Sequence, residues 1–130
     1  MDKYEEVELK VFGVFDSQEW KAKQIKSFPL GFDGEKGKPP YLRISILYSG
    51  GEVGIHSTSG MLMIEIFTAW GDGPTTATQI AGKLNSLFEK KSFGNLQFTL
   101  STLTPYSRDK DNSNLGRAIY SLPFTRFGVQ

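Results

Sequence analysis

The apolar positions in the middle of the chain follow two different periods. In Tyr41–Tyr48 and Met61–Trp70, both rich in Ile, Leu and aromatic residues, apolar side chains alternate as they do in strands. The run between them, Ser49–Gly60, is rich in Gly and Ser and predicts a long hairpin loop. The period then changes to that of a helix with one buried stripe, made by Ala77, Ile80, Ala81, Leu84, Leu87 and Phe88. A hairpin that leads into a helix is therefore the predicted nucleus of the domain.

The alternation also divides the strand side chains between two faces of the predicted sheet. The apolar face carries Leu42, Ile44, Ile46, Leu62, Ile64, Ile66 and Trp70. The mixed face carries Arg43, Ser45, Leu47, Met63, Glu65 and Phe67. We expect the helix that follows Pro74 to cover the apolar face. The mixed composition of the second face suggests that it meets something besides water.

The N-terminal third is less regular. Residues Asp2–Phe15 fit an amphipathic helix, although Val7, Leu9 and Val11 also alternate as in a strand. We favour the helix because Phe12 and Phe15 extend its apolar stripe. A short edge strand is possible around Lys23–Phe28, followed by an aromatic strap at Phe28–Phe32 and a loop at Asp33–Pro40.

The last third predicts two more strands, around Leu96–Leu100 and Arg117–Leu122, joined by a polar loop at Thr104–Leu115. Pro123 predicts the end of regular pairing or an edge position. The expected fold is one α+β domain over residues 1–130, with a mostly antiparallel sheet of four to five strands and long hairpin loops. An N-terminal helix and a central helix at about residues 75–90 flank this sheet.

Composition narrows the classes of function. A chain of 130 residues with 38% hydrophobic residues is long enough for one core, and a net charge of +1 gives no bulk attraction to nucleic acid or anionic membrane. With 0 Cys, disulfides, thiolate metal sites and a Cys nucleophile are excluded. The charged start, Met1–Glu6, does not suit a signal peptide, and no apolar run reaches the length of a membrane helix. We expect a soluble protein used without export.

Candidate chemistry is sparse. His56, the single His, stands in the Gly/Ser insert near Glu52, and an exposed loop histidine is the simpler interpretation. The run Asp109–Ser113 resembles the start of a calcium loop, but Asn114 and Tyr120 stand where Gly and Glu are needed, so a polar hairpin tip is preferred. The glycines at positions 50, 51, 54, 71 and 73 match no phosphate-binding signature. The sequence therefore predicts a protein that is not an enzyme and holds no metal or cofactor.

Two features favour assembly instead. The loops Ser49–Gly60 and Thr104–Leu115 exceed the usual length of hairpin connections. Aromatic residues and methionines are also abundant for one modest core, and such side chains are common at protein interfaces, although most of them would equally serve the core.

The central residues also carry a resemblance. The segments Pro40–Ile46, Gly60–Phe67 and Gly71–Pro74, followed by the Ala-containing helix Thr76–Phe88, resemble the tail-terminator (tail-completion) proteins of long-tailed bacteriophages. The strap at Phe28–Phe32 and the N-terminal helix stand where that family has such elements. Proteins of this family are α/β domains that assemble into hexameric rings, which cap the tail tube, stop its polymerisation and meet the head-side connector.

The resemblance implies a homo-oligomeric ring, contacts to the major tail-tube protein and to a head-completion or connector protein, and DNA that passes the lumen without specific binding. It implies no contact with a membrane. It also implies a location in the virion, at the head-proximal end of the tail, after assembly in the host cytoplasm. Interface candidates on the mixed face and in the insert are Arg43, Glu52, His56 and Glu65. The alternatives are another head–tail connector or tail-tube subunit, and a small non-viral protein-binding module.

Overall fold

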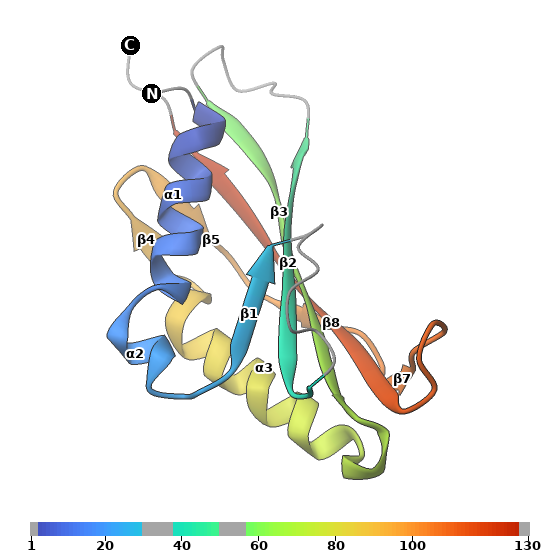
Figure 1. Cartoon of the computed structure of the whole chain (residues 1–130). Coiled ribbons are helices and arrows are strands. Elements are labelled where there is room, and N and C mark those ends of the chain that lie inside the picture. Colours follow the sequence, from blue (N-terminus) through green and yellow to red (C-terminus); the bar gives the residue numbers. More distant parts are fainter. Residues whose placement is uncertain (1–2, 30–37, 50–56, 128–130) are drawn as a thin grey trace.

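A computed structural model describes residues 3–29, 38–49 and 57–127 of the chain (Figure 1). The helices are α1 (Lys3–Phe15), α2 (Gln18–Lys21), the 3-10 turn η1 (Trp70–Asp72) and α3 (Pro74–Phe88). The strands are β1 (Lys26–Pro29), β2 (Tyr41–Ser49), β3 (Thr58–Ala69), β4 (Ser92–Phe93), β5 (Leu96–Phe98), β6 (Thr102–Leu103), β7 (Ser107–Arg108) and β8 (Leu115–Arg126).

All the described strands belong to one curled sheet. Its order is β1-β2-β3-β8-β5-β4, and β6 and β7 pair with β8 outside this path. Among the pairings of the described strands, only that of β1 with β2 is parallel. The predicted α+β class and mostly antiparallel sheet are confirmed. The strand number is higher than predicted, at 8 strands, because strands of two or three residues are too short to show an alternation.

The hairpin of β2 and β3 is longer than its apolar residues indicated. Ser49 pairs with Ser59, and the two hydroxyl oxygens lie 2.8 Å apart. The predicted loop Ser49–Gly60 was therefore too long: Ser49 and Thr58–Gly60 belong to the ladder. Gly60 is required there, because an added Cβ would lie 1.9 Å from the carbonyl oxygen of Leu47.

The core lies between one face of the sheet and the two long helices. Val7, Val11 and Phe15 of α1 pack in the same cluster as Ile80 and Leu84 of α3. The sheet contributes Leu42, Ile44, Leu62, Ile64, Ile66, Ala118, Tyr120 and Leu122 to this cluster. Both helices are thus confirmed, and the alternative strand at the N-terminus is wrong, since a helical stripe buries more apolar side chains against this face than a strand would.

Three further predictions about Trp70, Leu100 and the loop Thr104–Leu115 are wrong. Trp70 does not share the apolar face, since β3 ends at Ala69 and Trp70 opens η1, 37% exposed. Leu100 lies beyond the end of β5 and is 60% exposed. The predicted loop Thr104–Leu115 contains the short strand β7, so that it forms a hairpin with β8.

Pro123 does not end the pairing of β8, which continues to Arg126 next to β3. The carbonyl oxygen of Pro123 accepts from the Thr99 amide at 3.1 Å. Because the nitrogen and the carbonyl of a strand residue face the same neighbour, the missing N–H faces β5 and not β3. β5 ends at Phe98, so a donor at Pro123 is not needed there.

The N-terminal connection contains one helix that the sequence pattern did not predict. The short α2 begins after Ser17, whose hydroxyl accepts from the Trp20 amide, and it buries Trp20. The predicted edge strand exists as β1, parallel to β2. The strap Phe28–Phe32 begins within β1, and its remaining residues lie outside the described ones. None of the helices in residues 3–29, 38–49 and 57–127 has the length and hydropathy of a membrane span.

Candidate interaction surface

Three central strands leave one face of the sheet without a helix among the residues that the structure describes. Alternation and register place side chains of β2, β3 and β8 on the face opposite to α1 and α3. We call this surface the open face; it consists of Arg43, Ser45, Leu47, Met61, Met63, Glu65, Arg117, Ile119, Ser121 and Pro123. It corresponds to the predicted mixed face, extended by the third strand.

A network of charges occupies one half of the open face. Glu65 on β3 accepts from Arg43 Nε at 2.6 Å and from Arg43 Nη2 at 2.9 Å. It also accepts from Arg117 Nε on β8 at 2.6 Å. The Glu65 side chain is 12% exposed, whereas both arginines are about one third exposed. One carboxylate therefore ties three strands together through charge-assisted hydrogen bonds.

The ionisation of Glu65 is fixed by this geometry. Burial alone would raise the pKa of its carboxyl, but the hydrogen bonds from Arg43 and Arg117 outweigh burial and hold the pKa below the ordinary value of 4.5. The hydrogen bond to Glu65 likewise raises the pKa of Arg43. The network therefore stays charged at neutral pH, and the one carboxylate of Glu65 is shared by two guanidiniums, which leaves one positive charge in excess.

Aromatic side chains support this charged half. Tyr41 and Phe67 stack with their ring centroids 4.8 Å apart, and Leu115 completes a small buried cluster with them. The Arg43 guanidinium lies 5.3 Å from the centroid of Phe67. The stack and the ion pairs together stabilise the charged half within the domain itself.

The other half of the open face carries no ionisable side chain. We call it the uncharged half; it consists of Ser45, Leu47, Met61, Met63, Ile119, Ser121 and Pro123. Leu47 is 56% exposed, and the other members are half-buried. A shallow groove of about 420 Å³ runs along its end, lined by Leu47, Met61 and Pro123 among others. In a chain with 22% charged residues, a Met-containing surface without charge has the composition of an interface core.

The four predicted interface residues have different outcomes. Arg43 and Glu65 lie side by side on the open face, where they bind each other. Arg117, which the sequence reasoning did not nominate, completes their network. Glu52 and His56 lie outside the described residues. The only signal for Arg117 was its place opposite to the apolar residues of its strand, and that signal did not connect it to Glu65.

The other polar clusters of the described chain fasten elements to one another. Asn85 and Glu89 at the end of α3 accept from the Ser101 hydroxyl at 2.8 Å, and Asn85 also accepts from the Tyr120 hydroxyl. Burial raises the pKa of Tyr120 to about 12. Within the described residues, no three His, Cys, Asp or Glu side chains are grouped so that they could hold a metal ion.

The preferred hairpin tip at Asp109–Asn114 is confirmed. A side-chain oxygen of Asp109 accepts from the Asn112 amide at 3.0 Å, and the Asn112 side chain accepts from the Asn114 amide at 3.0 Å. These polar side chains therefore close the turn between β7 and β8.

Comparisons with known proteins bear on the fold. No protein-family description matches the sequence. No curated protein matches it either. A solved structure whose name states no function superposes with a TM-score of 0.61 at 17% sequence identity, over 90% of this chain and 86% of its own. This likeness shows that the fold occurs in another protein and shows nothing of activity.

Proposed function

We propose that this protein is a structural assembly subunit, specifically a tail terminator that forms a ring, caps a phage tail tube and joins it to the head-side connector. The observation that carries the proposal is the open face, which has one half held together by its own ion pairs and another half that is uncharged and uncovered by the described helices. Such a surface suits a protein partner rather than a small charged substrate.

Magnitudes indicate how large that contact must be. Full burial of an exposed Leu, Ile or Met side chain contributes about 1.5–3 kcal/mol, and the half-buried members of the uncharged half can contribute less. Association of two proteins costs about 4–15 kcal/mol in lost translational and rotational freedom. The uncharged half alone is therefore marginal, and a stable assembly needs a second contact elsewhere on the subunit.

The specific identity as a terminator rests on the sequence resemblance. Its segments Pro40–Ile46, Gly60–Phe67 and Thr76–Phe88 fall largely in β2, β3 and α3, the elements that build the sheet and cover it. The proposal places the protein in the virion, with the tail-tube protein below the ring, the connector above it, and DNA passing through the lumen.

Self-association is the first test. We expect the purified chain to form rings, seen by multi-angle light scattering and negative-stain microscopy. Met63→Glu introduces a charge into the uncharged half and should shift the chain towards monomers, because the carboxylate would lose its water at the contact. Gln79→Glu, on the exposed side of α3, is the matched control and should leave the rings intact.

Function is tested with polymerising tail-tube protein. Addition of the ring should limit tube length, and the Met63→Glu variant should not. A chain that stays monomeric at high concentration, forms no ring on the tube and leaves tube length unchanged would contradict the proposal and favour a protein-binding module outside a virion.

A further inference from the structure

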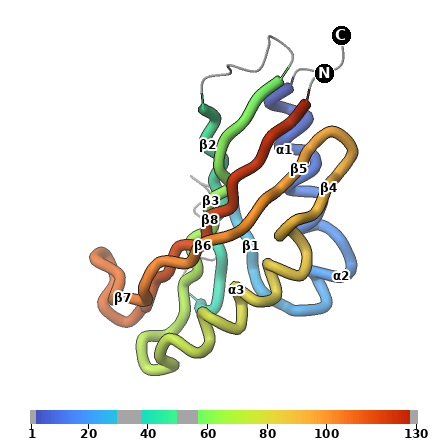
Figure 2. Tube along the Cα trace, turned by 180° about the vertical axis from the view of Figure 1, so that it is seen from behind, coloured from blue at the N-terminus to red at the C-terminus, as the bar shows by residue number. Residues whose placement is uncertain are grey.

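The hairpin of β7 and β8 projects from the body of the domain. Figures 1 and 2 show it extending beyond the rest of the sheet, on the opposite side of the molecule from α1. We call residues 106–117 the arm. Its base is held by the pairing of Ser107 with Arg117 and of Arg108 with Gly116.

A stacked platform anchors the base of the arm. The rings of Trp70 and Tyr106 lie parallel with centroids 5.5 Å apart. The Tyr106 hydroxyl lies 2.6 Å from the Thr68 hydroxyl, and the Trp70 amide donates to the Asn114 carbonyl at 2.8 Å. The platform is thus fixed on both sides before any partner arrives, which lowers the entropy cost of binding.

Arg108 differs from the other three arginines of the chain. Arg43 and Arg117 bind Glu65, and Arg126 binds Glu6. The Arg108 guanidinium instead lies 4.4 Å from the Trp70 ring centroid, and it forms no ion pair with any carboxylate of the described chain. A guanidinium that lies over an indole ring without a carboxylate partner keeps its donor fork available for one.

The charges around Arg108 favour a protein partner over nucleic acid. Asp109 and Asp111 alternate with Lys110 on the same arm, and Asp72 follows Trp70 closely in the chain, so the arm has no continuous basic surface. A nucleic-acid backbone carries a charge at every nucleotide and would meet these carboxylates together with the cations, whereas a single carboxylate on a protein surface would reach Arg108 alone. Trp and Arg are also the residue types that dominate binding energy at protein interfaces.

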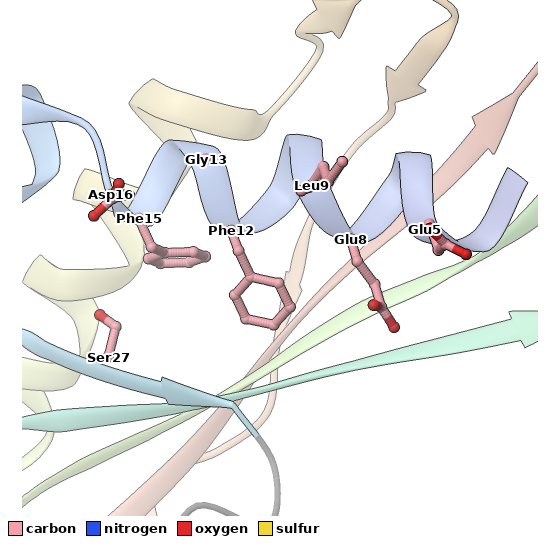
Figure 3. A pocket seen from close by; sticks show the side chains of 8 residues that line it. All are labelled: Glu5, Glu8, Leu9, Phe12, Gly13, Phe15, Asp16 and Ser27. Atoms are coloured by element: carbon pink, nitrogen blue, oxygen red, sulfur yellow. The ribbon is translucent and has the colours of Figure 1, made fainter. Parts of the chain in front are cut away.

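A groove with matching chemistry lies along α1. It has a volume of about 670 Å³, and Glu8, Leu9 and Phe12 of α1 contribute to its lining. Figure 3 shows Glu8 and Phe12 pointing from α1 to the same side, towards the strands. Leu9 is 59% exposed. Glu8 is exposed, and no cation of the described chain forms an ion pair with it.

We infer that the arm of one copy docks in the α1 groove of the next copy, with Arg108 paired to Glu8 and the edge of Trp70 packed on Leu9 and Phe12. The projecting arm and α1, which lines the groove, lie on opposite sides of the molecule, so the contact joins different copies. A head-to-tail contact of two different surfaces closes into a ring when its rotation permits. This inference rests on the proposed self-assembly and supplies the second contact that it needs.

A charge exchange tests the pairing. Arg108→Glu and Glu8→Arg should each raise the apparent dissociation constant of the ring about tenfold or more, since each places like charges at the contact. The double variant restores one attractive pair at every contact and should recover most of the lost assembly. Association is measured by analytical ultracentrifugation in low and high salt, and the single-variant defects should shrink in high salt.

Two controls make the same charge changes away from the contact. Lys83→Glu alters an exposed lysine of α3, and Glu19→Lys alters an exposed carboxylate of α2; both should leave association unchanged. Circular dichroism and urea unfolding verify that each variant folds. Rings that tolerate both single changes, or a double variant that recovers nothing, would overturn the inference while the proposed function stands. A loss of DNA binding in Arg108→Glu with intact rings would overturn it in favour of a phosphate. Failure of the wild-type chain to associate, both alone and on the tail tube, would overturn both.

Discussion

The two halves of the open face use the same three strands in different ways. In the charged half, Glu65 joins Arg43 and Arg117, and the stack of Tyr41 on Phe67 supports them. In the uncharged half, side chains such as Leu47 and Met61 have no comparable partners on their own face within the described chain. The difference separates two tasks: partly buried charges that share ion pairs hold the sheet together, and uncharged side chains left at the surface are available to a partner.

The largest effect is expected at Gly60, which lets β2 and β3 approach beneath the uncharged half. In Gly60→Ala the new Cβ would meet the Leu47 carbonyl at 1.9 Å, so the backbone must shift. We expect a loss of about 3 kcal/mol in unfolding free energy, measured with urea. Gly82→Ala is the control: its Cβ would meet nothing within 4 Å on α3, and it should stabilise the protein by about 0.5–1 kcal/mol. Equal effects at both positions would contradict this close approach.

Removal of Glu65 tests the charged half. Glu65→Ala leaves two arginines side by side without their carboxylate, and we expect the free energy of unfolding to fall by about 2 kcal/mol. This loss is smaller than for a fully buried ion pair, because both arginines are partly exposed. Met63→Ala, two residues away in β3, should cost less than about 1 kcal/mol in the monomer. The comparison would fail if the two variants lost the same stability.

Acid should weaken the charged half and spare the uncharged one. The folded pKa of Glu65 lies below its ordinary value of 4.5, so its contribution is present above that value and is lost as the pH falls through the folded pKa. The stability difference between wild type and Glu65→Gln should therefore shrink below pH 4.5, by less than about 1 kcal/mol for these partly exposed partners. Urea unfolding at a series of pH values measures it, and a difference that grows on acidification would reverse the assigned sign.

The smallest change in stability is expected in the uncharged half. Met61→Ser should alter the unfolding free energy of the monomer by about 0.5 kcal/mol or less, because Met61 is only half-buried, yet it should weaken self-association. Sedimentation and urea unfolding on the same sample separate these effects. A stability loss as large as that of Glu65→Ala would show that this half serves the fold.

The sequence predicted local patterns better than pairings between distant strands. Alternation placed Arg43 and Glu65 on the correct face, and helical spacing identified α1 and α3. It could not bring Arg117 to Glu65, because a period of two assigns a face without fixing the register between strands 52 residues apart. The prediction from Pro123 was wrong, because a proline is accepted at this position of the strand only where β5 has ended, and the end of β5 depends on the tertiary structure.

The central place of β8 has a consequence for the order of folding. β3 pairs with β8 along its whole length, and β5, β6 and β7 also pair with it. Because β8 follows all of these strands in the chain, they cannot pair with it until the residues of β8 have left the ribosome. The nascent chain would carry β3 with an unpaired edge throughout that interval, a condition that exposes it to wrong pairing with other chains. Folding of this domain is thus governed by non-local contacts, and premature termination before Leu115 would remove the strand on which the others depend.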